Sequence, residues 1–117
     1  MFTTYLNTAN SSTGGAALDT TGKNVVIKRL IIGNPVTSAN IWLYDENNVG
    51  NVTNTTGLKA KLTLPASFAT GQLPFTIALD TSYGAGLLLA MGGSVAIDQA
   101  IQLTVVWDYA QEPDNQV

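Results

Sequence analysis

The sequence contains no cysteine and no histidine among its 117 residues. Without cysteine, the chain cannot form a disulfide framework, a thiolate metal site or a cysteine nucleophile. Without histidine, it lacks the most frequent general base and the most frequent metal ligand of proteins. We therefore expect a protein that is not an enzyme and that holds no cofactor and no metal.

Charged residues are also scarce, at 11% of the chain, against roughly a quarter in average soluble domains. The five Lys and Arg residues are scattered and the net charge is −3. Nucleic-acid binding needs clustered cations that release the counterions of the phosphates, so we expect no nucleic-acid partner. Solubility falls instead to neutral polar residues, chiefly 15 Thr and 10 Asn.

Long hydrophobic runs are missing as well. The most apolar region, residues 84–97, is interrupted by Gly92, Gly93 and Ser94, which leaves it too short to span a bilayer. The first 15 residues lack the basic segment and apolar run of a secretory signal. We expect a soluble protein without a membrane partner, kept in the producing cell until that cell breaks.

What the chain does contain is period-two alternation, which predicts half-buried antiparallel strands. In residues 100–109 the apolar side chains at every second position, ending in Trp107 and Tyr109, share one face. In residues 58–64 the apolar side chains face inward, whereas Lys59 and Lys61 face outward. Further strands are predicted over residues 3–7, 24–33, 39–45, 73–80, 86–91 and 94–97.

Two local features refine these strands. Lys28 and Arg29 are adjacent and cannot both point outward from a regular strand, which predicts a bulge in residues 24–33. Gly92–Gly93 is typical of a tight hairpin turn between two strands. Pro74 fits the beginning of a strand or an edge position.

Short strands joined by Gly, Pro and Asn turns predict an all-β, single-domain antiparallel β-sandwich, either jelly-roll or immunoglobulin-like, with about seven or eight strands. We expect the sandwich over residues 24–110 and an exposed tail over 111–117. Residues 1–23 are expected to form a flexible N-terminal arm. One interpretation of the arm is a frayed terminus; the other is a segment that orders only against a neighbouring subunit, with Phe2, Tyr5 and Leu6 as its partner-binding anchors.

Trp42 and Tyr44 are the second candidate partner-binding pair. They alternate with Ile41 and Leu43, so if that aliphatic pair faces the core the aromatics point outward, as at a sugar-stacking or subunit interface. In the reverse register they belong to the core. We favour the core, because large aromatic side chains are mostly buried.

Motifs for chemistry are weak. Asp45, Asn47 and Gly50 faintly resemble a calcium loop, but Val49 stands where an oxygen ligand is needed. No nucleophile elbow, phosphate loop or dinucleotide motif occurs. The acids at strand ends, Asp80, Asp98 and Asp108, have nothing in the sequence that brings them together.

Three segments together carry a resemblance: KNVVIKRLIIGNPVTSANIWLYDENN, LPASFATGQLPFTIALDTSYGAGLLLAMGG and AIQLTVVWDY. Their strands and turns resemble small all-β virion proteins of tailed bacteriophages, including capsid decoration (cement) proteins and small adaptor or fibre-associated proteins. The resemblance covers roughly residues 23–109 and lies in the pattern of strands and turns.

The resemblance implies a non-enzymatic virion structural protein, made in the host cytoplasm, that bridges major capsid subunits and stabilises the shell. Its partners would be the major capsid protein or other virion proteins, together with copies of itself; a trimer is favoured, since it would match a local three-fold axis. The alternative is a tail- or fibre-associated adaptor or a carbohydrate-binding module.

Overall fold

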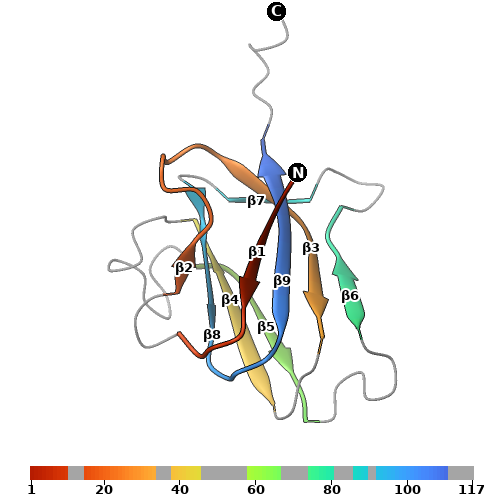
Figure 1. Cartoon of the computed structure of the whole chain (residues 1–117). Helices are drawn as coiled ribbons and strands as arrows, with labels where there is room; N and C mark the ends of the chain where they lie inside the picture. The colour runs from red at the N-terminus through yellow and green to blue at the C-terminus, as the bar shows by residue number, and fades with distance from the viewer. Residues whose placement is uncertain are drawn as a thin grey trace, which may run out of the picture.

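The computed structural model describes residues 1–10, 15–33, 38–45, 58–66, 74–80, 86–89 and 92–110. These residues form nine strands in two antiparallel sheets and no α-helix. The sheets pack face to face around one apolar core (Figure 1). The predicted all-β sandwich is therefore confirmed.

The first sheet contains five strands and has β3 (Val25–Ile32) near its centre. On one side β3 pairs with β9 (Leu103–Tyr109), which pairs in turn with β1 (Phe2–Leu6) at the edge. On its other side β3 is shared by two short strands, β6 (Phe75–Ala78) and β7 (Leu87–Leu89). Figure 1 shows β1, β9, β3 and β6 lying side by side in the front layer.

The second sheet contains β2 (Ala16–Ala17), β8 (Ser94–Ile97), β4 (Ala39–Tyr44) and β5 (Leu58–Leu64), in that order. The predicted alternation of β5 is confirmed, since its apolar side chains are partly or fully buried and the intervening polar side chains are exposed. All four residues of β8 are buried, and so are all residues of β4 except Asn40, as expected for the inner strands of a sheet covered on both faces.

The predicted bulge in β3 is confirmed. Ile27 lies opposite Trp107 and Arg29 lies opposite Val106, so Lys28 is the extra residue. The Lys28 carbonyl accepts hydrogen bonds from the backbone N–H groups of Leu79 and Asp80, at 2.8 and 3.1 Å. The bulge thus places two neighbouring cations outside the core and gives the displaced carbonyl new donors.

The core lies between the sheets and takes side chains from seven or more strands. Its members share near-complete burial and apolar character. The largest of those with essentially no exposure are Ile27, Leu30, Ile32, Ile41, Leu43, Leu89, Ile97, Ile101 and Leu103. Ile101, predicted inside a strand, precedes β9 but is still buried.

The N-terminal residues correct the expected arm over residues 1–23. The short strand predicted near residues 3–7 exists as β1, and its partner is β9 of the same chain. The Asn10 backbone N–H donates to the Ile97 carbonyl, and its side-chain oxygen accepts the Ile97 N–H, both at 2.8 Å. These bonds, with β2 and buried Leu18, make the segment part of both sheets.

The hairpin expected at Gly92–Gly93 is wrong. β7 pairs with β3 in the first sheet, whereas β8 pairs with β2 and β4 in the second. Both glycines have positive φ, 89° and 66°, and the carbonyls of Gly92 and Gly93 accept hydrogen bonds from Asp19 and Leu18. The pair therefore carries the chain from one sheet to the other. The predicted tail over 111–117 lies outside the described residues.

Candidate functional site

Three aromatic rings meet where β1 begins and β9 ends. Phe2 stacks on Trp107 with centroids 4.7 Å apart, and Tyr109 meets both rings edge-on, at 5.3 Å from Phe2 and 5.5 Å from Trp107. Strand register explains the meeting, because Phe2 lies directly opposite Trp107 and Tyr109 lies two residues further along the same face. We call Phe2, Trp107 and Tyr109 the aromatic cluster.

The cluster has a fixed base and an exposed rim. Trp107 is 6% exposed, and its indole N–H donates to the Thr4 hydroxyl at 3.0 Å. Phe2 and Tyr109 are 43% and 38% exposed. Exposed rings held by a buried one form a preorganised apolar surface, which can stack on a flat ligand or pack against another protein.

Asp19 lies beside the cluster and links it to the turn before β3. Its carboxylate accepts hydrogen bonds from the Thr21 hydroxyl at 2.6 Å, the Lys23 backbone N–H at 3.1 Å and the Tyr109 hydroxyl at 3.0 Å. The Thr21 bond, followed by the bonds from Lys23 and Tyr109, lowers the pKa of Asp19 against the opposing effect of burial. The carboxylate is therefore held in its charged form.

The pKa of Tyr109 is shifted in the opposite direction. Its hydrogen bond to Asp19, with burial and the negative charge of that carboxylate, raises the pKa of the Tyr109 phenol. The Lys23 ammonium lies 5.6 Å from the centroid of the same ring, within range of a cation–π interaction. One aromatic ring thus has an anion at its hydroxyl and a cation over its face.

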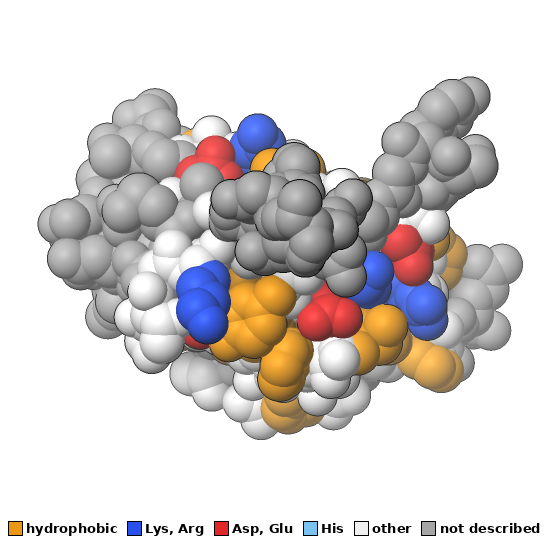
Figure 2. Space-filling view, turned by 90° about the horizontal axis from the view of Figure 1, so that it is seen from above, with side chains coloured by type: hydrophobic (Ala, Val, Ile, Leu, Met, Phe, Trp, Pro, Cys, Tyr) orange, Lys and Arg blue, Asp and Glu red, His pale blue; other side chains and the backbone are white. Residues whose placement is uncertain are grey.

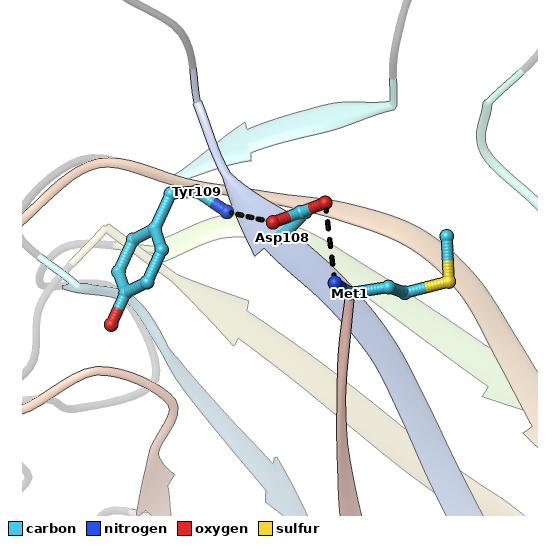
Figure 3. A network of polar contacts seen from close by, with 3 residues as sticks. All are labelled: Met1, Asp108 and Tyr109. Atoms are coloured by element: carbon cyan, nitrogen blue, oxygen red, sulfur yellow. Dashed lines mark hydrogen bonds and ion pairs between the residues drawn. The ribbon is translucent and has the colours of Figure 1, made fainter.

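A second polar contact lies next to the aromatic cluster, between Met1 and the end of β9. The Met1 ammonium lies 3.6 Å from one oxygen of Asp108, and the other oxygen accepts the Tyr109 backbone N–H at 2.9 Å (Figure 3). Both groups of the ion pair are substantially exposed, so the pair contributes little stability. It does place Met1, the residue before β1, against the last residues of β9.

An open hollow of about 540 Å³ adjoins this end of the five-stranded sheet. Its lining mixes apolar and charged residues: Val26, Lys28, Gly86, Leu88, Asp108, Tyr109 and Ala110. Figure 2, which looks down on this end, shows hydrophobic side chains next to both cations and acids. A hollow that combines apolar side chains with a few charged ones suits binding of a ligand or a partner.

The predicted partner-binding residues of β1 lie on two different faces of the strand. Phe2 belongs to the aromatic cluster, Tyr5 is 56% exposed on the opposite face, and Leu6 is buried in the core. Leu6 therefore anchors β1 to its own domain and is not available to a partner. The exposed residues of the three are Phe2 and Tyr5.

Trp42 and Tyr44 lie away from this site. Ile41 and Leu43 face the main core, so the aromatic pair is on the outer face of β4, yet it is buried there in a second cluster with Ala96 and Leu58. The Lys61 ammonium lies 5.5 Å from the Trp42 ring centroid, and burial raises the pKa of Tyr44. The register is therefore the one in which Ile41 and Leu43 face the core, and not the reverse register that we favoured, although both aromatic side chains are buried.

The strand-end acids have separate partners, as expected. Asp98 accepts hydrogen bonds from the backbone and side-chain N–H groups of Asn40, at 2.7 and 2.8 Å, and Asp80 pairs with Arg29 at 3.5 Å. Within the described ranges, no three His, Cys, Asp or Glu side chains gather as a metal site would require. Of the faint calcium motif, only Asp45 is among the described residues.

Sequence reasoning missed Asp19 and Lys23, and did not identify Tyr109 as part of a site. The signal for the rings was present, because alternation placed Trp107 and Tyr109 on one face. No pattern near Asp19 showed that its partner lies 90 residues away.

No helix in the described part of the chain is long and apolar enough to cross a membrane. Comparison of the chain with protein-family models, curated proteins and solved structures found no match.

Proposed function

We propose that this chain is a non-enzymatic structural protein of a bacteriophage virion, and specifically a capsid decoration (cement) protein that bridges major capsid subunits. It is made in the host cytoplasm and becomes part of the particle. The resemblance of its strand pattern to small virion proteins supports the phage assignment, and the distribution of exposed apolar side chains supports a binding role.

One observation carries the binding role. Among the described residues, all the large exposed hydrophobic side chains lie on or beside strands of the five-stranded sheet: Met1, Phe2, Tyr5, Leu88 and Tyr109. The outer aromatics of the four-stranded sheet are buried instead. Exposed apolar side chains gathered on one sheet suit contact with a larger partner, because burying them on that partner removes them from water.

Decoration would act through mass action. A protein that binds only the assembled shell stabilises that state by about 2.7 kcal/mol when its free concentration is about 100 times the dissociation constant. The role thus needs a rigid contact surface and many copies, and it needs no catalytic residue. The aromatic cluster, with Trp107 fixed beneath Phe2 and Tyr109, provides such a surface.

The test is binding to purified capsids of the producing phage by co-sedimentation. Tyr109→Ala should weaken binding strongly, because it removes an exposed ring of the cluster, whereas Lys59→Ala, a change to an exposed side chain on the other sheet, should leave binding unchanged. Equal binding by both variants would remove the cluster from the interface. No sedimentation of the unaltered chain would overturn the decoration role.

The alternative, a tail- or fibre-associated carbohydrate-binding module, is favoured by one feature of the same cluster. The exposed Tyr109 ring lies beside the Asp19 carboxylate and the Lys23 ammonium, and sugars are bound by stacking on aromatic faces with polar groups alongside. Binding of one glycan from a broad panel, lost in Tyr109→Ala, would favour this module over decoration. The surface tested is the exposed Phe2–Tyr109 rim, since Trp42 and Tyr44 are buried.

The proposed decoration protein is also a symmetric homo-oligomer. The exposed edge of β1 is the part of the chain that bears on its number of subunits.

A further inference from the structure

The edges of the two sheets differ in how well they are protected against pairing with another strand. β5 is an edge of the four-stranded sheet, and it presents Lys59 and Lys61 as exposed side chains. Lysines on an edge strand disfavour pairing with a second copy, because like charges would meet. At the other end of the five-stranded sheet, β6 has only four residues and follows Pro74, which also limits pairing.

β1 has none of these protections. Its five residues, FTTYL, include no charge, no proline and no glycine. It pairs with β9 on one side only, and no described strand lies beyond it. Tyr5 is 56% exposed and Phe2 43% exposed. An uncharged, exposed edge strand rich in Thr and aromatic residues is a template for strand addition.

The sequence of β1 is also complementary to itself. When two copies run antiparallel with Thr4 opposite Thr4, Phe2 lies opposite Leu6 and Thr3 lies opposite Tyr5. On the outer face an exposed aromatic side chain then meets an exposed β-branched one, which is a favourable cross-strand pair. The facing positions on the inner face are both apolar, so no polar side chain is set against an apolar one. A shift by one residue would set inner against outer side chains, so the register is specified.

We propose that two copies of this chain associate through their β1 strands, antiparallel and centred on Thr4, to form one continuous sheet across the dimer. The occupant of the β1 edge is therefore a second copy of the chain. The symmetry is twofold, since the same strand supplies both sides of the contact. The exposed Tyr5 ring would be covered by the exposed Thr3 of the other copy, which accounts for a large aromatic side chain at this edge.

This twofold contact differs from the trimer that the resemblance to virion proteins favours, because a trimer would need β1 to fit a different surface of its neighbour. The inference concerns the isolated chain and does not depend on a virion role. A dimer would equally suit a decoration protein that bridges two capsid subunits.

The experiment measures molar mass by sedimentation equilibrium over a concentration series, on a chain carrying no added N-terminal residues. The unaltered chain should approach twice its 12.3 kDa mass. The variant Thr3→Lys/Tyr5→Lys should dissociate about tenfold or more readily, since each dimer would contain two Lys–Lys pairs in place of two Thr–Tyr pairs. Both altered side chains are exposed, so the fold should persist, as checked by circular dichroism.

Two further variants make the test specific. Thr76→Lys/Ala78→Lys places the same charges on exposed positions of β6 and should remain dimeric. Mixing Thr3→Lys/Tyr5→Lys with Thr3→Glu/Tyr5→Glu should restore a mixed dimer, because the antiparallel register sets each lysine opposite a glutamate. A monomer or trimer for the unaltered chain, dissociation by the β6 variant, or no mixed dimer would each overturn the proposal.

Discussion

Gly86 is the residue at which a single added methyl group should disturb the sheet most. It immediately precedes β7 and has a φ of +134°. A Cβ at this position would lie 2.2 Å from the Ile27 carbonyl oxygen and 3.0 Å from a Val26 methyl carbon. The oxygen is backbone in the middle of β3, so it cannot move aside without breaking the pairing of β7 with β3.

The cost of Gly86→Ala follows from these two effects. A non-glycine residue in such a backbone conformation costs about 1–3 kcal/mol, and forcing an atom into packed structure costs about 1–3 kcal/mol. Together they should destabilise the fold by about 2–6 kcal/mol, a large share of the roughly 5–15 kcal/mol available to a domain. For a chain of this size the midpoint of thermal unfolding should fall by about 8–24 °C.

Gly33→Ala is the matched control. Its Cβ would meet the side-chain oxygen of Gln102 at 2.7 Å, but this exposed side chain can rotate that oxygen away, and the Gln102 Cβ at 3.2 Å needs to give by only a few tenths of an ångström. The change should alter stability by less than about 1 kcal/mol. Denaturant unfolding followed by tryptophan fluorescence measures both variants. Equal stability of the two would refute the close packing of β7 against the bulge in β3.

Three further predictions concern the core and the candidate site. Leu43→Ala should lower the free energy of unfolding by about 3–5 kcal/mol in denaturant unfolding, because this side chain is fully buried. Leu88→Ala should lower it by under about 1 kcal/mol, because that side chain is 48% exposed. Similar losses in the two variants would contradict the assigned faces. Thr4→Val should cost about 1–2 kcal/mol by leaving the Trp107 indole N–H without its acceptor, and an unchanged unfolding midpoint would exclude that bond. Because the pKa of Asp19 is lowered in the fold, its carboxylate stabilises the fold at pH values above the ordinary pKa of 3.8, and this contribution is lost as the pH falls through the lower folded pKa. Thermal unfolding of Asp19→Asn should therefore depend less on pH in the acid range than that of the unaltered chain. Superimposable pH profiles of the two proteins would contradict the Asp19 network.

The strands themselves were predictable because their pattern is local. β5 matches its predicted bounds and faces, since alternation between leucine and lysine leaves only one way to bury the apolar side. The bulge at Lys28 was predictable for a related reason. Two adjacent cations beside aliphatic residues cannot be accommodated in a regular strand.

Pairing between distant segments was not predictable in the same way. Residues 1–23 have too few apolar side chains to suggest a place in the core, yet β1 pairs with β9, which lies about a hundred residues later in the chain. The hairpin at Gly92–Gly93 failed because local turn chemistry does not reveal which sheet a strand joins. For Trp42 and Tyr44 the sequence offered two alternatives, core or exposed surface. Neither describes the pair fully, because both faces of β4 are buried.

The candidate site shows the same division. Alternation placed Trp107 and Tyr109 on one face, and composition drew attention to Phe2. The polar partners came from elsewhere: Asp19 from the turn before β3 and Met1 from the chain terminus. Only tertiary structure brings those groups to the end of β9.

The proposed virion role is tested most directly by counting copies of this chain in purified particles from the producing lysate. Quantitative mass spectrometry against the major capsid protein gives the ratio. Decoration of the shell predicts a ratio near one or a simple fraction of it. A few dozen copies at most would place the chain at a vertex, neck or tail, and its complete absence from the particles would contradict the virion role.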